Sequence, residues 1–246
     1  MGALLEIKDL GVDFGGFRAV DSVNMKIGDG EIRVIIGPNG AGKTTFMDMV
    51  TGKTRPTKGT IFFNGHNITG KEPGEIAGKY KIGRKFQGPN IFENMSVYQN
   101  IEIALKGYTS IWHTLTYKPN TRKRERIKAI LKKIKLYDMK DFMSSELSHG
   151  QRQWLEIGMV MAQSPKLIIL DEPTAGMTAD ETHQTGEMVK ELAGEHTIIV
   201  TEHDMDFVRQ VANRVTVLHQ GKLLAEGLLE EVEKNPEVIQ VYLKED

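Results

Sequence analysis

The sequence predicts an α/β fold in which buried strands alternate with helices. Segments 167–170 and 197–200 are short apolar runs of the kind found in strands buried on both faces of a parallel sheet. Segment 31–36 is a third strand of this kind, and it leads directly into 37–45, GPNGAGKTT, which fits the G-x-x-x-x-G-K-[ST] pattern of a phosphate-binding loop. A helical pattern follows at 46–50. Strand, glycine-rich loop and helix in this order indicate an α/β unit that binds phosphate.

Composition sets bounds on the class of protein. The 246 residues suit one large α/β unit or two small domains, and the net charge of −1 gives no electrostatic argument for nucleic acid or an anionic surface as a partner. The absence of cysteine excludes disulfides, thiolate zinc clusters and thiol catalysis. The sequence shows neither a signal-peptide pattern nor an apolar run near the ~18 residues of a membrane span, so we expect a soluble chain.

Each residue type in segment 37–45 has a physical reason to be there. The glycines let the backbone curl so that successive N–H groups point inward and hold an anion, and the helix that follows turns its partly positive N-terminus toward the same phosphates. Lys43 adds a point charge for the β- and γ-phosphates, and the Thr44 hydroxyl is placed to bind Mg²⁺. We therefore expect a nucleoside triphosphate, bound by Gly37, Pro38, Asn39, Gly40, Ala41, Gly42, Lys43, Thr44 and Thr45.

The N-terminal third predicts short antiparallel strands. Apolar and polar residues alternate over 23–27, a turn is expected at 28–30, and Asn64-Gly65 suits a two-residue hairpin turn with positive φ. The aromatic residues in segment 12–17 are compatible either with stacking on a purine ring or with an ordinary core, and the residues by themselves favour the core.

Between about 90 and 162 the pattern becomes helical. Ile127, Ile130, Leu131 and Ile134 form the apolar stripe of an amphipathic helix. Its other face is strongly basic, which is compatible with nucleic acid or lipid headgroups, but the absence of interleaved aromatics favours a solvated face. Ser148 suits the N-cap of a further helix, and by itself this is no more than a start signal.

Polar groups follow two of the apolar strands, where α/β sheets place their ligands. Asp171 and Glu172 come after 167–170, so one carboxylate can hold Mg²⁺, directly or through water, while the other orients or deprotonates water. Glu202-His203-Asp204 comes after 197–200. Adjacent residues of an extended segment point to different faces, so a polar contact from His203 to phosphate is favoured over a metal site.

Taken together, these residues resemble the ATP-binding subunits of ABC transporters over nearly the whole chain. Six motifs of that family occur in order. They are the adenine-stacking aromatic (Phe14), Walker A (37–45), the Q-loop (Gln87), the signature (147–151, here LSHGQ), Walker B (167–171) with its catalytic Glu172, and the switch histidine (His203). The position of Phe14 in this order reverses the preference for a core aromatic.

The resemblance implies a single ABC-type cassette, a P-loop NTPase with a RecA-like α/β core. Residues 1–90 would form an N-terminal antiparallel β subdomain and the first part of the core. Residues 91–162 would form a helical subdomain with the signature motif, and 163–246 the rest of the core and the C-terminal tail.

The resemblance also assigns roles to residues. Thr44, Gln87 and Asp171 would hold Mg²⁺ and its waters, and Glu172 would act as general base with catalytic contributions from His203 and Gln87. Ser148, Gly150 and Gln151 would bind the ATP of a partner subunit. Two departures from the family pattern, His149 and Thr178, stand where relatives commonly have glycine and aspartate.

The implied function is ATP binding and hydrolysis that drives solute uptake. Membrane permease subunits, a second cassette (homologous or identical) and a periplasmic or extracellular solute-binding protein would be the partners, and the chain would lie in the cytoplasm on the inner face of the membrane. Nucleic acid is not an expected partner. Two rival classes are a channel-free ABC-type ATPase that acts on DNA or ribosomes, which commonly has tandem cassettes or large insertions, and a regulatory module that holds ATP unhydrolysed, against which Glu172 argues.

Finer resemblance concerns the solute. Segments 92–97, 201–205 and 235–239 are similar to the branched-chain amino-acid uptake branch of the family. Within that branch, 149–159 and 175–178 are similar to the ATPases of urea transporters, so urea is the solute we expect, ahead of branched-chain amino acids.

Overall fold

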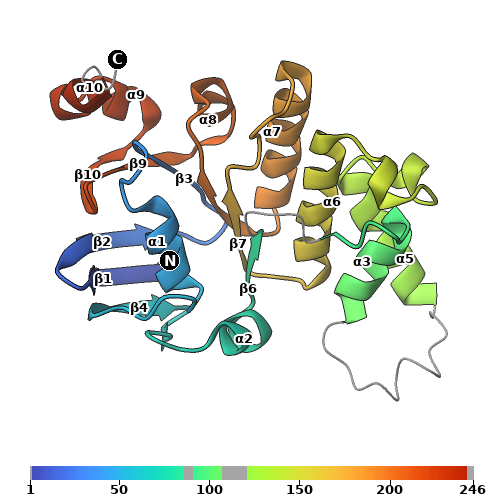
Figure 1. Ribbon diagram of the computed structural model, residues 1–246, viewed down its shortest axis with the longest axis horizontal. Coiled ribbons are helices and arrows are strands. Elements are labelled where there is room, and N and C mark those ends of the chain that lie inside the picture. Colours follow the sequence, from blue (N-terminus) through green and yellow to red (C-terminus); the bar gives the residue numbers. More distant parts are fainter. Residues whose placement is uncertain (1, 86–90, 107–120, 243–246) are drawn as a thin grey trace.

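The structure, a computed structural model, describes residues 2–85, 91–106 and 121–242 (Figure 1). Its strands form one antiparallel sheet of four and one mostly parallel sheet of six. The strands are β1 (Leu5–Phe14), β2 (Phe17–Ile27), β3 (Ile32–Ile36), β4 (Lys58–Phe63), β5 (His66–Asn67), β6 (Ile82–Lys85), β7 (Leu167–Asp171), β8 (Thr197–Thr201), β9 (Arg214–His219) and β10 (Lys222–Gly227). The α-helices are α1 (Lys43–Val50), α2 (Pro73–Glu75), α3 (Val97–Lys106), α5 (Thr121–Lys133), α6 (His149–Ala162), α7 (Ala179–Ala193), α8 (Met205–Val211), α9 (Leu229–Glu233) and α10 (Pro236–Tyr242).

The six-stranded sheet forms the centre of the molecule and confirms the α/β prediction. Its strand order is β10-β9-β3-β8-β7-β6, with all pairs parallel except β10 on β9. Residues of β3, β7 and β8 are buried, and they alternate between two apolar clusters on the two faces of the sheet. One face packs against α1 and the four-stranded sheet, and the other against helices that include α6, α7 and α8. Burial on both faces explains why these strands are continuous apolar runs rather than alternating ones.

The four-stranded sheet, in the order β2-β1-β4-β5, contains the hairpin predicted at Asn64-Gly65. The turn expected at 28–30 is also present, but it leads from β2 to β3 in the other sheet. Over 23–27 the residues alternate between buried and exposed, as the sequence predicts. At the second hairpin Phe63 pairs with His66, and Asn64 and Gly65 have φ of 49° and 76°, as a two-residue turn with positive φ requires. At the tip of the β1–β2 hairpin, Phe14 pairs with Phe17.

Helices α3, α5 and α6 lie together at one end of the long axis of the molecule, and α9 and α10 lie at the other end (Figure 1). The apolar stripe predicted on α5 is buried, with Ile127 and Leu131 fully enclosed. Two 3₁₀ turns, η2 (Tyr137–Met139) and η3 (Ser144–Glu146), lead from α5 to α6. Among the described residues, none of the helices combines the length and the hydrophobicity that a membrane crossing requires.

Candidate nucleotide-binding site

The phosphate-binding loop connects the end of β3 to the start of α1 at Lys43. Gly37 and Gly42 have φ of 149° and 97°, and at both positions neighbouring backbone leaves no room for a side chain. A Cβ atom on Gly42 would lie 2.5 Å from the carbonyl oxygen of Ala19, and one on Gly37 would lie 2.1 Å from that of Leu218. The two glycines therefore let the loop pack tightly against β2 and β9, which fixes the curl of the backbone around the expected phosphate position.

Lys43 is folded over the loop that it belongs to. Its Nζ donates hydrogen bonds to the carbonyl oxygens of Gly37, at 2.5 Å, and Pro38, at 3.0 Å. The ammonium group is thus held across the mouth of the loop, where it can exchange carbonyl partners for phosphate oxygens without moving far.

A hollow of about 330 Å³ opens over the loop. It is lined by Phe17, Ala19, Asn39, Gly40, Ala41, Gly42, Lys43, Thr44, Thr45 and Glu172. Seven of the nine expected loop residues therefore share one hollow with the expected general base, although they are separated by more than 120 positions in the chain. Gly37 and Pro38 are not among the lining residues, and their carbonyl oxygens accept the hydrogen bonds from Lys43.

The aromatic residue on this hollow is Phe17, whereas the sequence predicts that Phe14 stacks on adenine. The two rings are cross-strand neighbours, and their exposed fractions are 53% for Phe14 and 67% for Phe17. Neither residue belongs to the core, so the initial preference for a core aromatic is wrong. The stacking role of Phe14 stays a prediction, and Phe17 joins it as a candidate.

Asp171, at the end of β7, is buried and has partners on both carboxylate oxygens. Thr201, its neighbour across the β7–β8 ladder, donates to Oδ1 at 2.5 Å, and Arg84 donates to Oδ2 at 2.9 Å. Arg84 also bridges to Asp48 on α1. Arg84 and Thr201 were not singled out from the sequence, because only the parallel sheet brings β6, β7 and β8 side by side.

Glu172 follows directly in an unusual backbone conformation. Its φ is 45°, a left-handed value that costs a non-glycine residue about 1–2 kcal/mol. Its N–H donates to the carbonyl oxygen of Thr201 at 3.0 Å, which ties this turn to the end of β8. Strained backbone of this kind is typical of functional sites, where the surrounding structure maintains it.

His203 lies just beyond β8 with 72% of its side chain exposed, and it is not among the residues that line the hollow. Its neighbour Glu202 is buried. One oxygen of Glu202 accepts from both the N–H and the hydroxyl of Thr174, and the other accepts from the N–H of His203. Glu202 therefore holds the segment after Glu172 against the end of β8, a positioning role that the sequence did not reveal.

The residues present fit a magnesium ion that is bound mainly through phosphate. Within the described ranges, no group of three or more His, Cys, Asp and Glu side chains is arranged to hold a metal. Thr44 lines the hollow, and Asp171 lies at the end of the neighbouring strand β7. Mg²⁺ is commonly held by one or two protein oxygens together with substrate phosphates, and this sparse set suits that arrangement. Gln87, the third expected ligand, lies outside the described residues.

The signature residues form the start of α6, apart from the hollow. The Ser148 hydroxyl accepts from the N–H of Gln151 at 3.2 Å, and the Gln151 side chain accepts from the N–H of Ser148 at 3.0 Å, which together form a capping box. The predicted N-cap is therefore confirmed. The side chain of Gln151 is occupied with capping, and among the described residues the lining of the hollow includes neither Ser148, Gly150 nor Gln151.

The two departures from the family pattern lie close to one another. The Nε2 atom of His149 is 3.0 Å from the carbonyl oxygen of Ala175, in the segment between β7 and α7. Thr178 is the N-cap of α7, and its hydroxyl accepts from the N–H of Glu181. Threonine and aspartate are both good N-cap residues, so the helix keeps a side-chain cap at this position although the carboxylate is absent.

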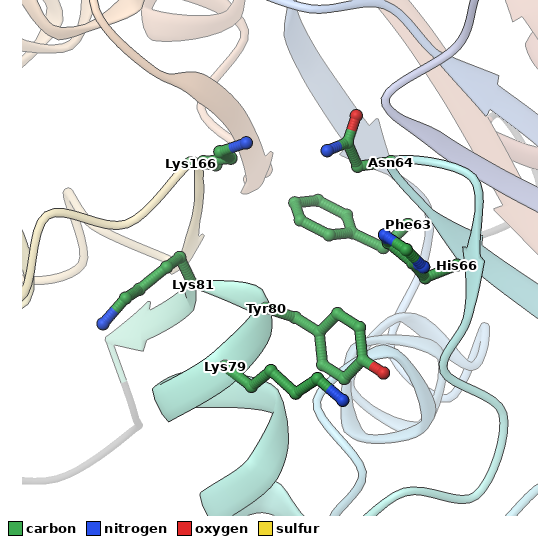
Figure 2. Close-up of a pocket in the computed structure, with 7 residues that line it drawn as sticks. All are labelled: Phe63, Asn64, His66, Lys79, Tyr80, Lys81 and Lys166. Atoms are coloured by element: carbon green, nitrogen blue, oxygen red, sulfur yellow. The ribbon is translucent and has the colours of Figure 1, made fainter.

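A separate basic hollow of about 270 Å³ lies between the end of β4 and the π-helical turn η1 (Ile76–Tyr80). Figure 2 shows the rings of Phe63 and Tyr80 on its walls, with Lys79, Lys81 and Lys166 around it. No residue of the phosphate-binding loop lines it, so it is not part of the nucleotide site.

Comparison with known proteins agrees with this geometry. A sequence model of the family described as "ABC transporter" matches residues 20–175. The high-affinity branched-chain amino acid transport ATP-binding protein LivG of Escherichia coli (strain K12) is 36% identical, with 98% of each chain covered. The corresponding protein BraF of Pseudomonas aeruginosa is 34% identical over the same share. A crystal structure of the ADP conformation of an ATP-binding cassette of an ABC transporter superposes with a TM-score of 0.86, at 33% identity and 99% coverage of both chains.

Proposed function

The chain belongs to the ABC transporter family, and on this premise we propose that it is the subunit that binds and hydrolyses ATP to drive solute import through a separate membrane permease. One observation carries the proposal: a single hollow brings the phosphate-binding loop together with Glu172. As a member of this family, the chain is an ATPase of the cassette type and has the corresponding fold.

The loop would bind the triphosphate through its backbone N–H groups and Lys43. On binding, Nζ would leave the carbonyl oxygens of Gly37 and Pro38 for the β- and γ-phosphates. Mg²⁺, when bound, would neutralise phosphate charge, and Thr44, Asp171 and Gln87 are the residues that would hold it and its waters. Arg84 and Thr201 already donate hydrogen bonds to Asp171. If Asp171 contacted Mg²⁺ through a metal-bound water, both of these hydrogen bonds would stay in place.

Glu172 would be the general base. Its carboxylate is on the hollow beside the loop, and the fixed turn of the backbone positions it to take a proton from the water that attacks the γ-phosphorus. His203, exposed at the end of β8, would contact the γ-phosphate once the site closes.

Two subunits would be needed for a complete site. The start of α6 carries N–H groups suited to an anion, yet it is not part of the hollow over this chain's own loop. Ser148 and Gly150 would therefore bind the γ-phosphate of ATP held by a second cassette, so that intact ATP joins the two subunits. A solute-binding protein outside the cell would deliver the solute to the permease.

Two solutes are candidates. Branched-chain amino acids are supported by relatives that are named for their transport and that match 98% of this chain. Urea is supported by segments 149–159 and 175–178, which meet in the structure at the contact between His149 and Ala175. Uptake of labelled leucine and labelled urea should be measured in cells with and without the gene. Loss of leucine uptake with normal urea uptake would exclude urea, and the reverse result would exclude the amino acids.

The catalytic assignment is tested by Glu172→Gln. We expect turnover to fall by about 10²–10⁴-fold, the usual contribution of a general base, while MgATP affinity changes little. Glu191→Gln is a matched control, because this glutamate is exposed near the far end of α7. Full ATPase activity in Glu172→Gln would remove Glu172 from the mechanism.

The assembly is tested by ultracentrifugation. Glu172→Gln should accumulate a dimer with MgATP, since ATP stays intact, and the addition of Ser148→Arg should return it to monomer by placing bulk and charge at the contact. ATPase activity that is undiminished and independent of protein concentration in a monomer would contradict the two-subunit site.

A further inference from the structure

The N-terminal ends of α6 and α7 are joined by one carboxylate, that of Glu181. Its Oε1 atom accepts from the hydroxyl of Ser148 at 3.2 Å. Its Oε2 atom accepts from the N–H of Thr178 at 3.0 Å and lies 3.2 Å from the Thr178 hydroxyl. Glu181 therefore completes the cap of its own helix with one oxygen and engages the cap residue of α6 with the other.

The same carboxylate packs against Gly150. A Cβ atom at Gly150 would lie 2.6 Å from Oε1 of Glu181 and 3.1 Å from Oε2, so the glycine of the signature segment makes room for this side chain. The backbone of Gly150 is buried, whereas Ser148 is exposed and Glu181 is partly exposed. A negative charge is thus present at the surface where the start of α6 is expected to receive an anion.

The hydroxyl of Ser148 has a single proton to donate. Its oxygen accepts from the N–H of Gln151 in the helix cap, and its proton is directed to Glu181. An ionised phosphate oxygen can only accept a hydrogen bond, so the hydroxyl of Ser148 would have to be the donor. Ser148 can therefore donate to a phosphate only if it stops donating to Glu181.

We propose that Glu181 is a positioning residue that holds the hydroxyl proton of Ser148 until a partner subunit presents a γ-phosphate there, and that its charge opposes this phosphate. The inference rests on the proposed function, in which Ser148 and Gly150 receive the partner's ATP. Closure of the two subunits then requires that the Ser148 hydroxyl of each subunit stop donating to Glu181. The charge of Glu181 also makes the affinity of the closed state for ATP lower than the signature residues alone would give.

The charge of Glu181 is well maintained. Hydrogen bonding from the backbone of Thr178 makes the largest contribution and lowers the pKa of the carboxyl below its ordinary value. Burial opposes this shift, and hydrogen bonds from the Ser148 and Thr178 hydroxyls add to it. The carboxyl is therefore ionised at neutral pH. For two unit charges about 5 Å apart, repulsion corresponds to about fourfold in affinity at the dielectric constant of water and to about tenfold at an effective value near 50, which suits a carboxylate as exposed as this one.

Glu181→Gln tests the proposal with little change of shape. Glutamine serves equally well as the third residue of a capping box, so the cap of α7 is kept, while the negative charge is lost and the amide can donate to the Ser148 oxygen. We expect the MgATP concentration that half-saturates dimer formation in the Glu172→Gln protein to fall about tenfold, measured by analytical ultracentrifugation. Asp180→Asn is the matched control. It removes the same charge one residue away, where the carboxylate accepts from Gln184, and it should shift the midpoint less than twofold.

The outcomes separate the inference from the function on which it rests. Dimer formation by Glu172→Gln that is unchanged or weakened by Glu181→Gln would overturn the inference and leave the two-subunit site standing. Absence of any ATP-dependent dimer in Glu172→Gln, both alone and mixed with a homologous second cassette, would overturn both. An equal gain from Asp180→Asn would reduce the effect to general surface charge and would also overturn it.

A double-mutant cycle tests the role of the proton. In a Ser148→Ala background there is no hydroxyl for Glu181 to hold, so Glu181→Gln should give a clearly smaller gain than in the parent. An equal gain in both backgrounds would refute the part of the proposal that concerns Ser148. Glu181→Gln and Asp180→Asn keep both helix caps, so their melting temperatures should stay within a few degrees of the parent. Ser148→Ala removes the N-cap of α6 and lowers the melting temperature by itself, so in that background Glu181→Gln is compared with Ser148→Ala and not with the parent.

Discussion

Removal of the phenyl ring of Phe17 should weaken ATP binding about fivefold. Phe17 is the one aromatic residue among the described residues that line the hollow over the phosphate-binding loop. Base stacking on an aromatic side chain contributes roughly 1–3 kcal/mol. We expect the low end, about 1 kcal/mol, because the ring is at an exposed hairpin tip and leaves one face of the base in water. This corresponds to about fivefold in Kd.

The measurement is calorimetric titration of MgATP into the wild type, Phe17→Ala and Phe14→Ala. Phe14 is the matched control, since it pairs with Phe17 across the same hairpin and does not line the hollow. Because both rings are largely exposed, neither substitution should change the free energy of unfolding by more than about 0.5 kcal/mol. GTP should lose about as much affinity as ATP, since stacking tolerates either base.

A fivefold or greater loss in Phe14→Ala with none in Phe17→Ala would refute this reasoning. It would show that the family position predicted from the sequence is the stacking residue, and that the hairpin tip moves when nucleotide binds. Unchanged affinity in both variants would remove aromatic stacking from the site altogether.

Two further predictions concern charge. Lys43→Ala should reduce MgATP affinity at least tenfold without unfolding the protein, because charged hydrogen bonds to phosphate contribute about 1.5–3 kcal/mol. Calorimetric titration of a variant with a normal melting curve tests this prediction. Unchanged affinity would mean that the loop is not the site. Hydrogen bonding from Lys58, and then from Ser22, lowers the pKa of Asp21 to about 2 from 3.8. A depressed carboxyl pKa contributes stability that is fully present above pH 3.8 and is lost as pH falls toward 2. In urea titrations the stability advantage of wild type over Asp21→Asn should therefore shrink across that interval, and an advantage that is undiminished at pH 2 would contradict the assignment.

Local sequence determined the elements and the loop. The continuous apolar runs, the Asn64-Gly65 turn, the stripe on α5 and the Ser148 cap are all present as predicted, because each depends on residues within one turn or one strand of each other. Segment 37–45 encodes its own curvature through glycine, so the phosphate-binding loop could also be identified without the fold.

Only the tertiary structure decided which distant residues meet. Parallel pairing of β6, β7 and β8 places Arg84 and Thr201 on Asp171, and the approach of α6 to α7 places Glu181 on Ser148. The sequence contains no local signal for such contacts, because hydrogen bonds between side chains on different elements depend on strand order and helix packing. The sequence gives no local signal for Phe17 either, because Phe14 is the same residue type in the same hairpin, and only the tertiary structure shows that the ring of Phe17 is on the hollow.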